Sequence, residues 1–136
     1  MTATIAFELV TPERLVKSEP VEMVVVPGAE GDMGVLPGHA LLIGTLRPGL
    51  VTTYEDGRPV ERLFVAGGFV DVSPERCTVL AEEAEPLTEI GRAEAEARLA
   101  RAREALADAA TDAAKAHGQR AVHIAETLLS LIDRSA

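Results

Sequence analysis

The chain has 136 residues, of which 47% are hydrophobic, so it is long enough to bury a stable core in one or two domains. A net charge of -9 would repel a polyphosphate backbone, and an aromatic content of 3% leaves few stacking surfaces, so a nucleic-acid partner is excluded. The sequence has no apolar run near the roughly 20 residues of a membrane span and no signal-like N-terminus, which favours a soluble, cytoplasmic protein without a direct lipid span.

The first 86 residues are predicted to form an all-β sandwich of about ten short strands, because apolar runs alternate with turn residues at short intervals. The Asp56-Gly57 pair predicts one tight hairpin, and the segment from Ser73 to Arg76 predicts the turn of a second. The single Cys77 lies in an alternating run and is expected to be an inert core thiol. The runs that predict strands are 5–10, 14–17, 21–26, 35–36, 40–42, 45–46, 50–54, 60–66, 69–72 and 77–81.

Residues 87–136 are predicted to form an α-helical hairpin, because the sequence after Pro86 lacks proline, is rich in alanine and changes to a helical period. Asp108, Thr111 and Asp112 are candidate turn and cap residues between the helices. Gly118 is an alternative position for the break between the two helices. Small residues dominate two apolar stripes, which are Ala95, Leu99, Ala102, Leu106 and Ala109, and then Ala114, Gly118, Ala121, Ala125, Leu128 and Ile132.

A Gly/Pro-rich loop over residues 24–40 could cradle a phosphate or dock another protein. A P-loop needs Gly-Lys-Ser/Thr, which this segment lacks, and Glu30 and Asp32 would repel an anion. The glycine spacing does not match the dinucleotide fingerprint either. The residues expected to shape the loop are Gly28, Gly31, Gly34, Pro37 and Gly38.

No other pattern indicates an enzyme active site. His39, His117 and His123 are too dispersed to predict a metal site. A cluster of three carboxylates, Glu82, Glu83 and Glu85, is expected to be a solvated acidic edge. Neither a metal nor a cofactor is therefore expected.

The order of motifs then becomes specific. The segment "PGAEGDMGVLPGHALLIGTLRPG", followed by "FVAGGFVDVSPERCTVLAEEAE" and an Ala/Arg-rich helical hairpin, resembles the epsilon subunit of F-type ATP synthases over essentially the whole chain. The resemblance implies a ten-stranded sandwich with a helix pair. It also implies a non-catalytic subunit of the rotor stalk, bound to the gamma subunit and the c-ring at the cytoplasmic face of a bacterial inner membrane.

The resemblance favours docking over phosphate binding. It implies that the loop from Glu30 to His39, including Met33, faces the c-ring and the foot of gamma, with Asp32 and His39 as contacts. A purely structural role, in which the glycines only form tight turns, is compatible with docking. The alternative function is a free-standing sensor of a small molecule or nucleotide.

The resemblance also implies a helical tail that can reach the alpha/beta catalytic head and slow ATP hydrolysis modestly. Some epsilon subunits bind ATP through a pattern of Ile-Asp-x-x-Arg-Ala with a further Arg-Ala pair. Here Gly91 and Glu94 stand where the Asp and the first Arg belong, although Arg101 and Ala102 match. We therefore expect no ATP binding by the isolated chain.

Overall fold

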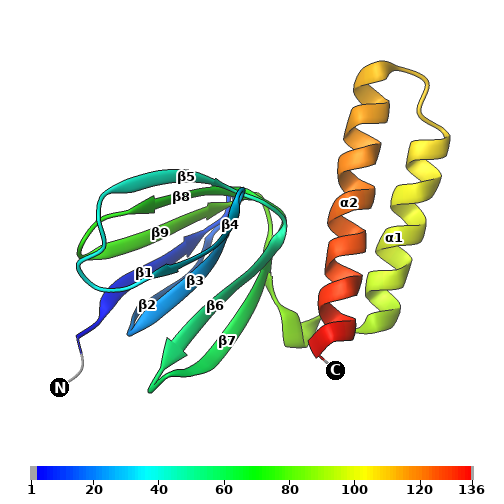
Figure 1. Ribbon diagram of the computed structural model, residues 1–136. Helices are drawn as coiled ribbons and strands as arrows, with labels where there is room; N and C mark the ends of the chain where they lie inside the picture. Colours follow the sequence, from blue (N-terminus) through cyan, green and yellow to red (C-terminus); the bar gives the residue numbers. More distant parts are fainter. Residues whose placement is uncertain (1–2, 136) are drawn as a thin grey trace. The chain divides into compact units, whose positions relative to one another are not determined.

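The computed structural model describes residues 3–135, and the chain divides into two compact units with a boundary between Leu87 and Thr88. The first unit is built from strands and the second from helices, as Figure 1 shows. No helix within the described range is both long enough and apolar enough to cross a membrane.

The first unit contains ten strands in one hydrogen-bonded sheet that folds into two layers (Figure 1). The order is β10-β7-β6-β3-β5-β8-β9-β1-β2, and β4 pairs with β3. All pairs are antiparallel except β1 with β9. The strands are β1 Ile5–Val10, β2 Leu15–Val21, β3 Met23–Gly28, β4 Gly31–Val35, β5 Leu42–Leu46, β6 Gly49–Glu55, β7 Arg58–Val65, β8 Gly68–Val72, β9 Arg76–Ala81 and β10 Ala84–Pro86.

Alternating residues of these strands form the core of the sandwich. Ile5, Phe7 and Leu9 of β1 are fully buried, whereas the residues between them are at least partly exposed. Period-two alternation of this kind places one face of a strand inside and the other outside. The predicted all-β sandwich with a helical hairpin is confirmed.

Four strands differ from the sequence prediction. The separate runs 40–42 and 45–46 form the single strand β5, which begins only at Leu42. β4 spans five residues where only Val35 and Leu36 were expected as strand, and the three residues of β10 were not predicted at all. β2 continues through Pro20 to Val21. Proline cannot donate to a ladder, but β2 is at the end of the sheet path and can tolerate it there.

The two predicted hairpins are confirmed. Asp56 and Gly57 have φ values of 53° and 72°, the pair of positive values that a type I′ turn requires between β6 and β7. The turn between β8 and β9 closes through a hydrogen bond of 2.8 Å from the Ser73 amide to the Arg76 carbonyl oxygen.

The second unit is the predicted hairpin of two helices, α1 Arg92–Ala107 and α2 Asp112–Ser135, preceded by a short 3-10 turn over Leu87–Glu89. Thr111 caps α2, because its hydroxyl accepts a hydrogen bond of 3.0 Å from the Ala114 amide. The alternative break at Gly118 is wrong, since that residue is buried inside α2. A Cβ there would lie 3.0 Å from Leu106 Cα, so glycine lets the two helices approach closely.

Candidate docking surface

The Gly-rich segment is a β-hairpin rather than a loop. β3 pairs with β4 through Gly28 and Gly31, and the turn between them consists of Ala29 and Glu30. A Cβ on Gly28 would lie 2.7 Å from the Gly31 carbonyl oxygen, and Gly31 has a φ of 149°, so both positions need glycine. Gly34 has no positive φ, and a Cβ there would meet only Met23 Sδ at 3.8 Å. Neither the backbone conformation nor the surroundings of Gly34 therefore require glycine, although Gly34 was expected to shape the loop.

The structure separates the two ends of the predicted docking segment. Glu30 is at the hairpin tip, whereas His39 follows a turn at Pro37 and Gly38 beyond the far end of β4. Gly38 has a φ of 84° and donates a hydrogen bond of 2.8 Å to the Pro74 carbonyl oxygen in the β8–β9 turn. The five residues of β4 separate these ends by about 16 Å at a rise of 3.3 Å per residue.

The strand β4 runs between these two ends. Within residues 3–135, β3 is the one strand that pairs with β4, so the other edge of β4 is open. Glu30 and Asp32 are exposed and His39 is half-buried, but Met33 packs against the hydrophobic core. We define the β4 edge as residues 29–34, and Glu30 and Asp32 are its charged side chains. A role for Met33 as a contact stays a prediction.

Arg47 is a residue of this surface that sequence reasoning missed. Its guanidinium forms an ion pair of 2.5 Å with Asp32 and donates a second hydrogen bond of 2.5 Å to the Gly28 carbonyl oxygen. Asp32 is thus paired within the chain rather than freely available. A signal existed in the sequence, because Arg47 is the one basic residue between Lys17 and Arg58, in a stretch that carries several carboxylates.

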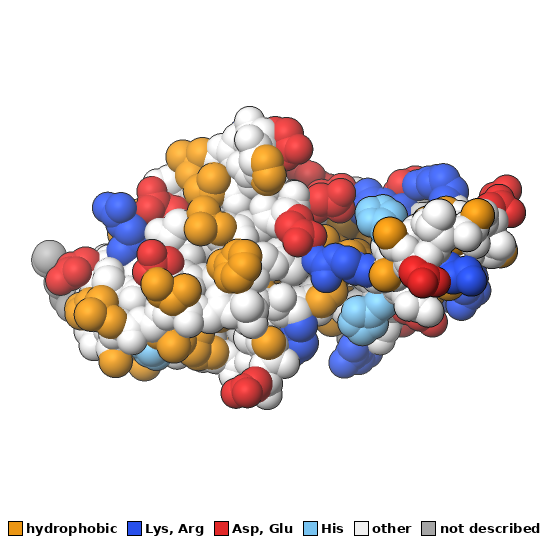
Figure 2. Space-filling model, turned by 90° about the horizontal axis from the view of Figure 1, so that it is seen from above, with side chains coloured by type: hydrophobic (Ala, Val, Ile, Leu, Met, Phe, Trp, Pro, Cys, Tyr) orange, Lys and Arg blue, Asp and Glu red, His pale blue; other side chains and the backbone are white. Residues whose placement is uncertain are grey.

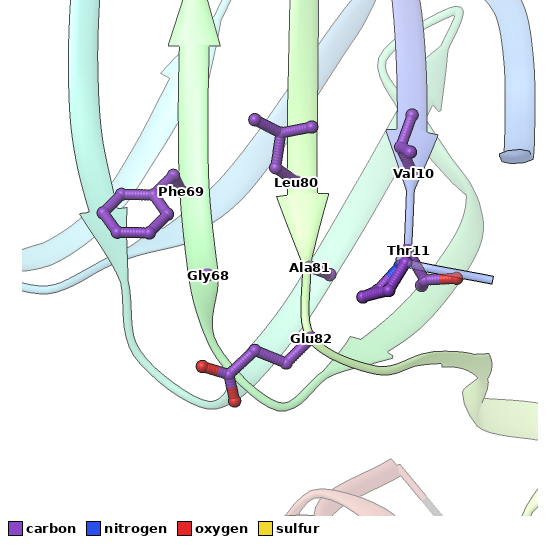
Figure 3. A pocket seen from close by; sticks show the side chains of 8 residues that line it. Val10, Thr11, Gly68, Phe69, Leu80, Ala81 and Glu82 are labelled. Atoms are coloured by element: carbon purple, nitrogen blue, oxygen red, sulfur yellow. The ribbon is translucent and has the colours of Figure 1, made fainter. Parts of the chain in front are cut away.

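A second missed feature is a row of large apolar side chains on the outer face of the sandwich. Strand register places Phe69 beside Leu80, Leu80 beside Val10, and Val10 beside Leu15. Phe69 and Leu15 are each 55% exposed and Leu80 is 47% exposed, whereas Val10 is partly buried. Figure 2 shows hydrophobic side chains exposed on one face of the strand-built unit. We call Val10, Leu15, Phe69 and Leu80 the apolar row. Figure 3 shows three of them, Phe69, Leu80 and Val10, on neighbouring strands.

A hollow of about 330 Å³ adjoins the apolar row, with Pro12 among the residues that line it. Figure 3 shows Gly68 in its wall and Glu82 at one side. Gly68 has a φ of 136°, and a Cβ there would lie 2.1 Å from the Leu80 carbonyl oxygen. This glycine is therefore needed for the backbone that forms the hollow. A contiguous exposed apolar surface of this kind is typical of a protein–protein contact.

No catalytic constellation appears in the part of the chain that the structure describes. Burial raises the pKa of the Cys77 thiol to about 12, with a smaller contribution from the charge of Asp71, so this cysteine stays protonated and unreactive. Within residues 3–135, no three His, Cys, Asp or Glu side chains come together to hold a metal ion.

The start of α1 carries the residues weighed for ATP binding. The Glu94 carboxylate pairs with Arg98 at 3.1 Å and with Arg101 at 3.4 Å, and the hydrogen bond from Arg98 holds the pKa of Glu94 below its ordinary value. Arg92 pairs with Glu96 and with Asp133 of α2. These arginines therefore pair with carboxylates of the hairpin, and the absence of ATP binding stays a prediction.

Comparison with known proteins identifies the family. Residues 4–87 match the family described as "ATP synthase, Delta/Epsilon chain, beta-sandwich domain". The ATP synthase epsilon chain of Rhodospirillum rubrum is 52% identical over 130 residues, which cover 96% of this chain and 97% of that one. The chain belongs to the ATP synthase epsilon family. The epsilon chain of Paramagnetospirillum magneticum is 49% identical over 132 residues, covering 97% of this chain and 99% of the relative.

Solved structures agree with the family assignment. A chain in the cryo-EM structure of the Euglena gracilis mitochondrial ATP synthase, described as OSCP/F1/c-ring, matches with a TM-score of 0.78 and 30% identity. The match covers 96% of this chain and 82% of that chain. A chain from the Tetrahymena thermophila central stalk and c-ring matches with a TM-score of 0.68 at 14% identity, which shows a shared fold. The epsilon-family fold therefore extends over both units.

Proposed function

We propose that this epsilon-family chain is a non-catalytic subunit of the central stalk, bound to the gamma subunit and the c-ring of a proton-translocating ATP synthase. It transmits rotation of the ring to the catalytic head. The observation that carries this proposal is the apolar row, because three large exposed side chains and the partly buried Val10 between them form a continuous apolar surface across four neighbouring strands, which calls for a protein partner. The assemblies named for the Euglena and Tetrahymena relatives support a stalk partner and a ring.

The two surfaces take different partners in this proposal. The apolar row and its hollow receive apolar side chains of gamma, since burial of apolar area drives stable association. The β4 edge meets the polar loops of the c-ring, since it exposes Glu30 and Asp32 and its backbone is held by pairing with β3. The chain then lies peripherally at the cytoplasmic face of a bacterial inner membrane.

The helical hairpin acts in this proposal as a weak latch on ATP hydrolysis. Its helices bury mainly small residues against each other, so opening costs little burial free energy. An opened hairpin could extend toward the alpha and beta subunits. Its inhibition is modest, because Lys115, Arg120 and Arg134 are the basic residues of α2 that could meet an acidic surface there.

A binding experiment tests the stalk assignment. The full chain is captured on a purified complex of gamma and c-ring, and Leu80→Glu is compared with Val60→Glu, which changes an exposed apolar residue of β7 that is 60% accessible. Leu80→Glu is expected to abolish capture, because it puts a charge into an apolar contact. Val60→Glu is expected to bind like the unmodified chain. Equal binding by both variants would contradict this use of the apolar row, and failure of the unmodified chain to bind would favour the free-standing sensor.

A further inference from the structure

One arginine holds the tip of the β3–β4 hairpin from both sides. Gly28 precedes the turn at Ala29 and Glu30, and Asp32 follows that turn after Gly31. The Arg47 guanidinium binds the Gly28 carbonyl oxygen and the Asp32 carboxylate. Each of these hydrogen bonds measures 2.5 Å. A planar guanidinium offers its donors in a fixed fork, so this pair of bonds fixes the position of the tip relative to β5.

Backbone contacts strengthen the same attachment. The Arg47 amide donates a hydrogen bond of 2.9 Å to the Pro27 carbonyl oxygen, and the Ala29 amide donates one of 2.9 Å to the Thr45 carbonyl oxygen. The end of β5 and the hairpin tip therefore move together. A loop that is ordered before binding loses less conformational entropy when a partner arrives.

The contact with Arg47 also makes the two carboxylates near the tip, Glu30 and Asp32, differ in how far their charge is compensated. Asp32 pairs with Arg47, so its charge is largely compensated inside the chain. Glu30 is exposed, and within residues 3–135 its side chain forms no hydrogen bond or ion pair. The uncompensated charge at the tip is that of Glu30.

We propose that Arg47 is the positioning residue of the β4 edge and that Glu30, rather than Asp32, is the carboxylate that meets the partner. The inference rests on the proposed docking of the β4 edge on the ring. The partner group is a basic side chain on a polar loop, because a free carboxylate on a rigid tip is complementary to a cation. Asp32 contributes by holding Arg47 in place.

Hydrogen exchange in the full chain tests the positioning role without a partner. The Ala29 amide, which donates to Thr45, is expected to exchange about tenfold faster in Arg47→Gln, while amides of β8 and β9 exchange at their original rates. Arg47→Lys keeps the charge without the fork and should restore only part of the protection. Arg58→Gln, which removes one exposed positive charge at the start of β7, serves as the matched control and should change neither rate. Unchanged exchange of Ala29 in Arg47→Gln would overturn the positioning role.

Binding to the gamma and c-ring complex at several salt concentrations tests the division between the carboxylates. Glu30→Gln is expected to weaken binding about fivefold and to reduce its salt dependence, with no change in Ala29 exchange. Asp32→Asn is expected to speed that exchange. The double variant Arg47→Gln/Asp32→Asn should bind no more weakly than Arg47→Gln alone, because the two residues act through one contact.

The outcomes separate this inference from the proposed function. Failure of the unmodified chain to bind would overturn the docking proposal, and with it the role of Glu30, while the exchange rates would still decide the role of Arg47. Normal binding by Glu30→Gln, together with weak binding and normal exchange in Asp32→Asn, would overturn the division of roles and assign the contact to Asp32.

Discussion

Gly28 and Gly34 both belong to the Gly-rich segment, but only Gly28 lies too close to another backbone atom to accept a side chain. Gly28→Ala is expected to destabilise the first unit by about 1 to 3 kcal/mol, because the new Cβ would lie 2.7 Å from a backbone oxygen that cannot rotate away. Gly34→Ala is the matched control and should change stability by less than about 1 kcal/mol, since its Cβ would meet only ordinary contacts. Urea unfolding of both variants measures the difference. Equal destabilisation would show that the hairpin backbone, rather than this close approach, sets the tolerance.

The Glu94 carboxylate supplies a pH-dependent contact on α1. Hydrogen bonding from Arg98, followed by the contribution of Arg101, lowers its pKa below the ordinary value of 4.5. The contact therefore stabilises the folded helix above the unfolded pKa and is lost as the pH falls through the folded pKa. An NMR titration of the Glu94 carboxyl carbon should show a midpoint below 4.5 that rises toward that value in Arg98→Gln. A midpoint that does not respond to Arg98→Gln would contradict the assigned cause.

At the scale of the elements, the crossing of α1 and α2 depends on a small residue. Gly118→Val is expected to push the helices apart and destabilise the hairpin by about 1 to 3 kcal/mol, because a Cβ there already lies 3.0 Å from Leu106 Cα. Ala116→Val changes an exposed position of the same helix and should cost only its helix propensity, less than about 1 kcal/mol. Hydrogen exchange resolved by residue would report the loosening in α2 and leave β9 unchanged. Equal effects of the two variants would mean that the crossing tolerates a larger side chain.

For the whole molecule, removal of the helical unit tests which functions the strand-built unit performs by itself. A chain ending at Leu87 keeps every residue of the sandwich core, so it should remain folded and restore coupled proton transport in membranes that lack the subunit. Under the proposed function, ATP hydrolysis should rise by no more than about threefold, or ~0.6 kcal/mol, since the latch is weak. A folded truncated chain that fails to restore coupling would show that docking needs the helices. A much larger rise in hydrolysis would show a stronger latch.

Most of the fold could be predicted because its signals are local. The alternation of β1, the Asp56-Gly57 turn and the Thr111 cap each involve residues a few positions apart, and the structure contains all three. The length of β4 was underestimated because Gly31 and Gly34 interrupt the alternation of apolar and polar residues that predicts a strand. Glycine is disfavoured in strands on average, but pairing with β3 supplies the hydrogen bonds that propensity alone does not predict.

The proposed docking surfaces were only partly predictable, because they depend on contacts between distant residues. The sequence alone determined the sandwich, the helical hairpin, the charged Glu30 and Asp32 and the motifs that indicate the epsilon family. The tertiary structure decided that Asp32 is bound by Arg47, fifteen positions away. It also decided that Val10 and Leu80 lie side by side in the apolar row, through the parallel pairing of β1 with β9. The physical reason is that local propensity acts between neighbours in the chain, whereas strand order and register are set by burying one common core.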